Sequence, residues 1–140
     1  MSVARRRVRV VAALLAHPER EGVFLCQQRL PGGAQALLWE FPGGKVEPGE
    51  REQDALVREC REELDVEVAV DRRLWEGVHA YPELEVELIL YSARLLSGEP
   101  KSLGAEALAW RTLAEMQALP FCEADVPLLE DLVAGRVPTR

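Results

Sequence analysis

Cysteine and long apolar runs are both scarce in this chain of 140 residues. Cys26, Cys60 and Cys122 lie far apart and form no CxxC pair, which argues against a disulfide framework and against a zinc site. We therefore expect three reduced thiols in the core. No apolar run approaches the roughly 20 residues that a membrane-spanning helix needs. Arg5 to Arg7 precede a short apolar stretch without a signal-peptide cleavage pattern, so we expect a cytoplasmic protein with no membrane partner.

Basic residues are also in the minority. The chain has 17 Lys and Arg against 24 Asp and Glu, a net charge of −7 at pH 7. This balance argues against nucleic acid as a partner, because phosphate backbones are bound by basic surfaces. A small phosphorylated substrate remains compatible with an acidic enzyme when a divalent cation lies between the two sets of negative charge. Where the acidic residues gather is therefore more informative than their total.

The length and the apolar content of 48% are ordinary for one globular unit, so we expect residues 1–140 to form a single domain. Apolar periodicity and turn residues predict strands at 7–15, 23–28, 37–41, 66–70, 74–79, 84–95 and 107–110. Helices are predicted at 50–64, between 112 and 120, and from about 126 to 134. This order predicts an α/β fold with a mixed central sheet and helices on both faces.

Acidic residues gather on the helix expected at 50–64. Glu59, Glu62 and Glu63 have the i, i+3, i+4 spacing that places three carboxylates on one side of a helix. Like charges at this spacing destabilise a helix by roughly a few tenths of a kcal/mol per pair. Arg58, four residues before Glu62, has the opposite charge to compensate. The run is therefore either a solvated charged face or a set of metal ligands.

A glycine-rich loop from Gly43 to Glu50 leads directly into this helix. Glycines let the bare backbone approach a ligand, and carboxylate and carbonyl oxygens are the ligands that Mg²⁺ and Mn²⁺ prefer. The loop is not a P-loop, because GxxxxGK[ST] is absent. It is not an EF-hand loop, because the alternating Asp and Asn ligands are missing. The loop and the acidic helix together favour a metal site.

The segment from Gly44 to Val66 resembles the Nudix box. Gly44 is followed by five residues and Glu50, then by seven residues and the run Arg58-Glu59-Cys60-Arg61-Glu62-Glu63-Leu64-Asp65-Val66. One position departs, because Asp65 stands where the family has glycine. Asp tolerates the left-handed conformation that the glycine provides, so we expect only a small stability cost. The segments flanking the box are similar to the MutT-like branch, in particular to bacterial CTP pyrophosphohydrolases and 8-oxo-dGTP hydrolases; they are Gln28-Arg29, Trp39 to Glu50 and Ala124 to Leu129.

The resemblance implies a Nudix-type α/β/α sandwich and metal-dependent cleavage of a nucleoside triphosphate to a monophosphate and pyrophosphate. It implies that Glu59, Glu62 and Glu63 bind Mg²⁺ or Mn²⁺ together with the Gly43 carbonyl. Glu50 and Arg58 are then supporting catalytic residues. The alternative is a non-catalytic nucleotide sensor of the same fold. Such domains commonly lose carboxylates of the box, whereas this chain keeps all of them.

Three residues outside or beside the acidic helix are further candidates. Glu106 is either an additional metal ligand or an exposed loop carboxylate, and Gly104 stands at the offset from Trp110 where we expect the acid of MutT-like relatives. Arg29 lies twelve residues before Phe41, the spacing at which those relatives place an arginine on the substrate phosphate. Lys45 either contacts phosphate or is solvated.

Asp125 is the most informative residue about the substrate. CTP-type enzymes carry Asp at the matching position, whereas 8-oxo-guanine hydrolases carry Asn. An ionised carboxylate only accepts hydrogen bonds, which suits an exocyclic amine such as cytosine N4. The leading substrate is therefore (d)CTP or a modified relative, with 8-oxo-dGTP as the alternative. Asp125 also stands where the last helix needs an N-cap. We expect a small-molecule nucleotide substrate and an enzyme that works as a monomer or a homodimer.

Overall fold

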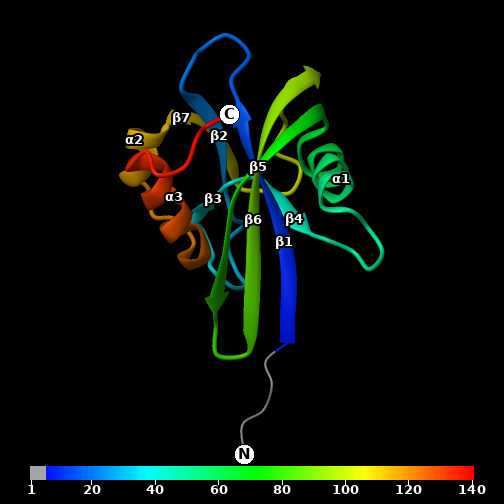
Figure 1. Cartoon of the computed structure of the whole chain (residues 1–140), viewed down its shortest axis with the longest axis vertical. Coiled ribbons are helices and arrows are strands. Elements are labelled where there is room, and N and C mark those ends of the chain that lie inside the picture. The colour runs from blue at the N-terminus through cyan, green and yellow to red at the C-terminus, as the bar shows by residue number, and fades with distance from the viewer. Residues whose placement is uncertain (1–5) are drawn as a thin grey trace, which may run out of the picture.

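The computed structural model describes residues 6–140; residues 1–5 of the expected domain lie outside this range. Within it, the chain forms one seven-stranded sheet and three α-helices with a short 3-10 turn (Figure 1). The strands are β1 (Arg6–Ala16), β2 (Val23–Gln28), β3 (Trp39–Glu40), β4 (Gly43–Lys45), β5 (Glu67–Ala80), β6 (Leu84–Ser97) and β7 (Ala107–Thr112). The helical elements are α1 (Glu52–Leu64), α2 (Leu113–Gln117), η1 (Glu123–Asp125) and α3 (Val126–Val133).

The sheet is mixed, as the sequence predicts. Its strand order is β3-β2-β1-β6-β5, with β4 paired to β1 and β7 paired to β2. β1 and β6 run parallel in continuous register, from Arg6 opposite Leu84 to Ala16 opposite Arg94. The other strand pairs are antiparallel. β1 therefore lies inside the sheet, between β2 and β6, and both of its faces are buried.

Helices cover both faces of the sheet, which confirms the predicted sandwich. Figure 1 shows α1 on one side and α2 with α3 on the other. Alternate residues of β1 enter two separate cores: Val11 packs in the cluster that contains Leu56 of α1, and Leu14 packs in the cluster that contains Leu128 of α3. Burial on both faces explains why β1 reads as a nearly continuous apolar run.

Two expected strands are in fact one. β5 runs unbroken from Glu67 to Ala80, although the sequence predicts a break before Leu74. The polar residues in between are accommodated by register shifts against β6, between Val70 and Arg73 and between Arg73 and Trp75. Irregularities of this kind let a strand bend without losing its partner, which a pattern of alternation does not reveal.

The ends of other elements also differ from expectation. The strand expected at 37–41 shortens to Trp39–Glu40, because Leu37 has a left-handed φ of 62° and leaves the strand. The acidic helix begins at Glu52 rather than Glu50, because the Glu50 N–H donates to the Glu47 carbonyl in a turn before it. The last helix ends at Val133 and the preceding one at Gln117, each shorter than expected.

Several local expectations are confirmed. Asp65 ends α1 in the left-handed conformation, with φ 55° and ψ 44°. Thr112 and Glu115 form the expected capping box of α2. The three cysteines, Cys26, Cys60 and Cys122, are buried free thiols. Within residues 6–140, no helix is long and apolar enough to cross a membrane.

Candidate active site

Two adjoining hollows lie between the loop that follows β2, the β3–β4 segment and the start of α3. The first, of about 470 Å³, is polar at the end formed by Gly43, Gly44, Lys45, Glu59, Glu63 and Gly104. The second, of about 490 Å³, is walled mainly by Tyr81, Pro82, Leu84, Val86, Cys122 and Ala124. Arg29, Glu40 and Asp125 line both hollows, so the polar cleft and the apolar pocket form one continuous site.

Two glycines bring the backbone of β4 close to its neighbours. A side-chain carbon on Gly43 would overlap the Val11 carbonyl of β1, so only glycine lets β4 lie so closely against β1. A side-chain carbon on Gly44 would overlap the carboxylate of Glu59. The bare backbone of β4 therefore lies directly beside an acidic side chain of α1, as the glycine-rich loop predicted.

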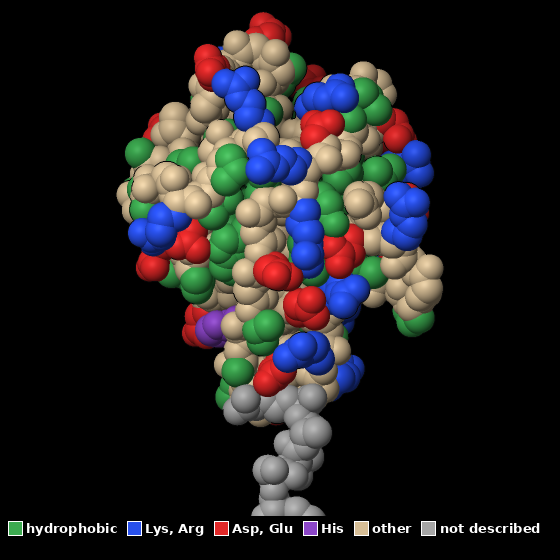
Figure 2. Space-filling view, viewed as in Figure 1, with side chains coloured by type: hydrophobic (Ala, Val, Ile, Leu, Met, Phe, Trp, Pro, Cys, Tyr) green, Lys and Arg blue, Asp and Glu red, His purple; other side chains and the backbone are tan. Residues whose placement is uncertain are grey.

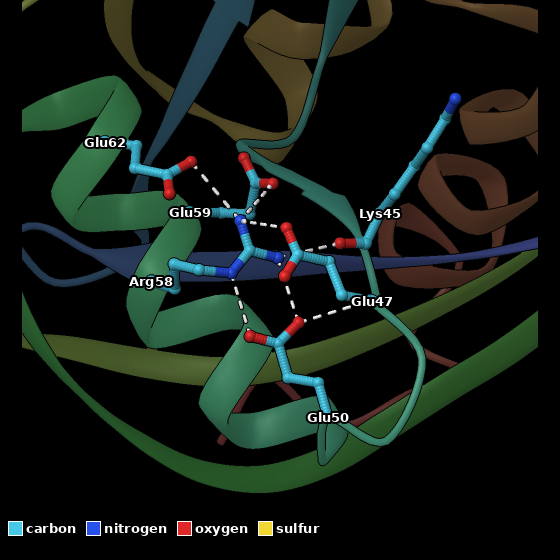
Figure 3. Close-up of polar contacts among 6 residues, drawn as sticks. All are labelled: Lys45, Glu47, Glu50, Arg58, Glu59 and Glu62. Atoms are coloured by element: carbon cyan, nitrogen blue, oxygen red, sulfur yellow. Dashed lines mark hydrogen bonds and ion pairs between the residues drawn. The ribbon is translucent and has the colours of Figure 1, made fainter.

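Arg58 is the centre of an ion-pair network (Figure 3). Its Nε and Nη2 donate to both oxygens of Glu50, at 2.8 and 3.0 Å. Its Nη1 donates to Glu59 at 3.0 Å and to Glu62 at 3.3 Å, and its Nη2 also donates to the Lys45 carbonyl at 3.0 Å. One guanidinium therefore ties the glycine-rich loop to two of the predicted metal ligands.

The network places Glu50 against Arg58, and its supporting catalytic role stays a prediction. Hydrogen bonds from Arg58 and from the Glu47 N–H lower the pKa of Glu50 to about 2. Glu50 thus stays ionised over the whole physiological range and holds Arg58 through two parallel bonds, the strongest arrangement of this pair. The sequence predicted the pairing of Arg58 with Glu62 but not its two bonds to Glu50, because Glu50 lies in a turn outside the helix.

The three predicted metal-binding carboxylates differ in their surroundings. Glu59 and Glu63 line the polar cleft, whereas Glu62 does not line it and its side chain is 55% exposed. Burial raises the pKa of Glu59, and the charges of Glu62 and Glu63 act in the same direction, while Arg58 lowers it. Across residues 6–140, no three Asp, Glu, His or Cys side chains converge as a metal cluster. The metal-binding role of the set stays a prediction.

Arg29 lies in the site where its spacing predicted it. Its Nη1 donates to Glu40 at 3.1 Å and its Nε to the Ala34 carbonyl at 3.2 Å. The other oxygen of Glu40 accepts from Gln27 at 3.0 Å. Glu40 lines both hollows and was missed by the sequence reasoning. The available signal was a lone carboxylate between the aromatic residues Trp39 and Phe41.

Asp125 is buried at the junction of the two hollows, with 6% of its surface exposed. Its Oδ2 accepts the N–H of Phe41 at 3.1 Å, and its side chain makes no capping bond at the start of α3. Asp125 therefore stands at the N-cap position of α3, as the sequence predicted, but its side chain does not cap the helix. Asp125 has a helical backbone conformation, with φ −86° and ψ −18°, unlike the extended one typical of an N-cap. Burial raises its pKa to about 7, and the charge of Glu40 adds to this.

The remaining candidates divide between the site and the surface. Lys45 lines the polar cleft, and its side chain points away from the Arg58 network in Figure 3. Glu106 is exposed and does not line the cleft; its N–H donates to the Gln28 carbonyl at 2.8 Å. Gly104, two residues earlier, does line it. The structure therefore does not bring Glu106 together with the other predicted ligands.

Comparisons with known proteins identify the family. The protein-family model described as the NUDIX domain matches residues 11–131 of this chain. The chain is 37% identical over 131 residues to the CTP pyrophosphohydrolase of Escherichia coli, covering 94% of this chain and 95% of that protein. It is 32% identical over 129 residues to an 8-oxo-dGTP diphosphatase of Haemophilus influenzae, covering 91% and 93%.

Solved structures show the same fold. The solution structure of the E. coli ORF135 protein matches with a TM-score of 0.78 at 36% identity, over 94% of this chain and 92% of that one. The MutT protein of Methanosarcina mazei matches with a TM-score of 0.83 over 96% and 99%; at 20% identity this is a likeness of fold. Because the family model spans most of the chain and the E. coli relative aligns almost end to end, this protein belongs to the Nudix family.

Proposed function

We propose that this Nudix protein is a metal-dependent pyrophosphohydrolase that cleaves a nucleoside triphosphate to a monophosphate and pyrophosphate, with residues 1–140 working as one catalytic domain. The observation that carries the proposal is the continuity of the two hollows. Glu59 and Glu63 line the polar one, and Asp125 lines both. A polyphosphate suits the polar end beside the acidic helix, and a nucleobase suits the apolar pocket, where a few polar groups give orientation.

The residues at the polar end suit Mg²⁺ or Mn²⁺. Glu59, Glu63 and Gly43 bring carboxylate and carbonyl oxygens, the donors that hard cations prefer, to one cleft. The missing side chains of Gly44 and Gly104 leave the space that these two carboxylates occupy. The groups that would hold the ion are the carboxylates of Glu59, Glu62 and Glu63 and the carbonyl of Gly43.

The chain's own residues orient the ligands and the substrate. When bound, a divalent ion neutralises polyphosphate charge and lowers the pKa of the attacking water. Arg58 holds Glu59 and Glu62 through ion pairs, so both carboxylates keep a fixed orientation. A carboxylate in the cleft accepts the proton of the attacking water, which is general-base work. Arg29 and Lys45 supply positive charge beside the phosphate oxygens.

Asp125 supports (d)CTP, or a modified cytosine nucleotide, as the substrate. Its buried carboxylate accepts hydrogen bonds when ionised, and the exocyclic amine of cytosine only donates them. The E. coli relative that aligns over 94% of this chain carries the name CTP pyrophosphohydrolase. We therefore propose a small cytosine nucleotide as the substrate bound at this site.

A second candidate substrate is 8-oxo-dGTP. Because the pKa of Asp125 is about 7, both of its protonation states are populated near neutrality. The protonated form donates a hydrogen bond, which suits a carbonyl oxygen of an oxidised guanine. The H. influenzae relative is named an 8-oxo-dGTP diphosphatase.

The decisive experiment is pyrophosphate release from CTP, dCTP, 5-substituted dCTPs, dATP, dGTP and 8-oxo-dGTP, with and without Mg²⁺ or Mn²⁺. We expect metal-dependent release that is fastest with a cytosine nucleotide. A preference for 8-oxo-dGTP would select the second candidate. Folded protein that binds nucleotide without turnover would instead identify a sensor. In that assay the Glu59→Gln variant should lose metal-dependent release, and unchanged release would refute the assignment of the cleft.

The state of association is a separate part of the proposal. We propose that the enzyme works as a monomer or a homodimer. Light scattering coupled to size-exclusion chromatography, with and without CTP, measures this directly. A stable higher oligomer would contradict it.

A further inference from the structure

Gln27 is a buried polar residue near the end of an apolar strand. Its surface is 7% exposed, and the four residues before it on β2 are buried and hydrophobic. Among residues 6–140 the other buried polar side chains are Ser92 and Asp125. Ser92 bonds to the Arg72 backbone and lines neither hollow, whereas Gln27 lines the polar cleft. Because a buried amide is costly unless it is hydrogen-bonded, the partner of Gln27 is informative about the site.

The partner of this amide is Glu40, on the neighbouring strand. β2 and β3 are antiparallel with Gln27 opposite Glu40, so the two side chains lie on the same face of the sheet. The Gln27 Nε2 donates to Glu40 Oε2 at 3.0 Å. Arg29 comes two residues after Gln27, on that same face, and its Nη1 donates to Glu40 Oε1 at 3.1 Å. The Glu40 carboxylate is therefore held at both of its oxygens.

Arg29 is in turn held at two of its three nitrogens. Its Nε donates to the Ala34 carbonyl at 3.2 Å and its Nη1 donates to Glu40, while within residues 6–140 its Nη2 makes no hydrogen bond. A planar guanidinium held at two nitrogens has a set direction for the third, which suits a phosphate oxygen in the cleft that Arg29 lines. Setting this direction beforehand reduces the freedom that the side chain loses when the nucleotide binds.

We infer that Gln27 is a positioning residue: its buried amide fixes the Glu40 carboxylate, and Glu40 fixes the guanidinium of Arg29 for the phosphate of the substrate. This inference rests on the proposed function, in which Arg29 binds phosphate. Without the amide, the Glu40 side chain can turn away from Arg29. Gln27→Met keeps the length of the side chain and removes the amide. We expect it to bind a nucleoside triphosphate about 10-fold more weakly than wild type.

The first test measures the binding of α,β-methylene-CTP, an analogue that is not cleaved between those phosphates, with Mg²⁺ by isothermal titration calorimetry. Ser92→Ala is the matched control, because it also removes buried hydrogen bonds but lies outside the site. Gln27→Met should show the weaker binding, and Ser92→Ala should match wild type. Equal affinity in all three proteins, or an equal loss in both variants, would overturn the inference. Wild-type protein that binds no analogue would instead refute the proposed function.

The second test follows the Nε–H signal of Arg29 by nuclear magnetic resonance of isotope-labelled protein without nucleotide. Slow exchange of this proton with solvent reports a fixed guanidinium. Exchange should be about 10-fold faster in Gln27→Met than in wild type, because Arg29 is then held less firmly, and unchanged in Ser92→Ala. An unaltered exchange rate in Gln27→Met would show that the amide does not act on Arg29, and the inference would be wrong.

A third test exchanges the two side chains, which keeps both the hydrogen bond and the total charge. When Gln27→Glu is combined with Glu40→Gln, the amide at position 40 donates to the carboxylate at position 27, and its oxygen still accepts from Arg29. This double variant should bind the analogue more tightly than Gln27→Glu alone, in which two carboxylates face each other. Binding that does not recover would mean that Gln27 does not act through Glu40, which would overturn the inference.

Discussion

The Oδ2 atom of Asp125 accepts the backbone N–H of Phe41 at 3.1 Å, across 84 positions of sequence. This bond joins the start of α3 to the segment between β3 and β4, and it fixes a buried carboxylate at the junction of the polar cleft and the apolar pocket. Among residues 6–140 it is the one hydrogen bond that the Asp125 side chain makes, and it uses one of the two carboxylate oxygens. The same contact therefore serves the packing of α3 and fixes the side chain that we propose to recognise a base.

Asp125→Asn should change which nucleotide is preferred. The amide can still accept the Phe41 N–H, so the fold is retained, but its NH₂ group donates where the carboxylate only accepts. Mismatched buried polar groups cost about 1–3 kcal/mol. We expect the ratio of kcat/KM for CTP over 8-oxo-dGTP to fall about 10- to 100-fold. The exposed neighbour Glu123, changed to Gln, is the control and should keep the wild-type ratio. An unaltered ratio in Asp125→Asn would show that Asp125 does not read the base.

The raised pKa of Asp125 predicts a pH-dependent stability. Burial is the main cause, and the folded-state pKa is about 7 against 3.8 for an ordinary Asp. Between these values the folded protein binds more protons than the unfolded chain, so the free energy of unfolding falls as pH rises from about 4 to 7. The Asp125 contribution is at most roughly 4 kcal/mol over that range. Urea unfolding at several pH values should give a flatter profile for Asp125→Asn, and parallel profiles would contradict the shift.

Arg58→Gln should weaken catalysis without unfolding the protein. It removes the guanidinium that holds Glu50, Glu59 and Glu62, and residues in that position typically contribute about 10- to 100-fold to metal affinity or activity. We expect a fall of that size in pyrophosphate release, with a higher Mg²⁺ requirement. Arg61→Gln is the matched control, because Arg61 lies on the same helix, is exposed and pairs with Glu67 outside the site. Equal effects of the two substitutions would mean that charge alone is responsible.

Asp131→Asn should loosen α3 from the sheet. The Trp75 Nε1 of β5 donates to Asp131 at 2.8 Å, and Arg136 donates to the other carboxylate oxygen at 2.8 Å. Hydrogen bonds to a charged group contribute about 1.5–3 kcal/mol each, less where solvent reaches the pair. We expect the urea concentration at the midpoint of unfolding to fall measurably. Glu130→Gln, exposed on the same helix, should leave it unchanged. A loss that is equal in both variants would exclude a specific role of the Trp75 contact.

Asp65 offers a test of backbone strain at the end of α1. Its φ of 55° is in the left-handed region. Glycine adopts this conformation most easily, and Asp tolerates it better than alanine does. Asp65→Ala should lower the free energy of unfolding by about 1 kcal/mol, while Asp65→Gly should not lower it. Lys101→Ala separates the exposed ion pair to Asp65, which we expect to contribute little. A loss in Asp65→Gly as large as that in Asp65→Ala would mean that the side chain, not the strain, matters.

Figure 2 shows how the charged residues are distributed on one face of the molecule, where Lys and Arg side chains alternate with Asp and Glu rather than forming a basic patch. The ion pairs Arg7–Glu85, Arg9–Glu87 and Arg94–Asp71 on the strands have this mixed character. On these strands the charges are therefore paired across neighbouring strands, while Glu59 and Glu62 of α1 both pair with Arg58.

The sequence by itself determined the family, the mixed sheet between two helical layers, and the acidic helix with its glycine-rich loop. These depend on patterns that act over a few residues: the apolar run of β1, the spacing of Glu59, Glu62 and Glu63, and the turn at Asp65. The resemblance offered Arg29 as a residue of the site and left Lys45 open, and both line the cleft. Local reasoning missed the continuity of β5 and the early end of the strand at Glu40, because register shifts and edge positions depend on the neighbouring strand.

Only the tertiary structure decided which side chains meet. The sequence offered Asp125 as a helix cap, but packing turns its carboxylate toward Phe41 and the cleft instead. It offered Glu106 as a ligand, but the turn before β7 leaves Glu106 exposed and brings Gly104 against Glu63. Local patterns carry no information on such contacts, because each contact joins segments that lie far apart in the sequence.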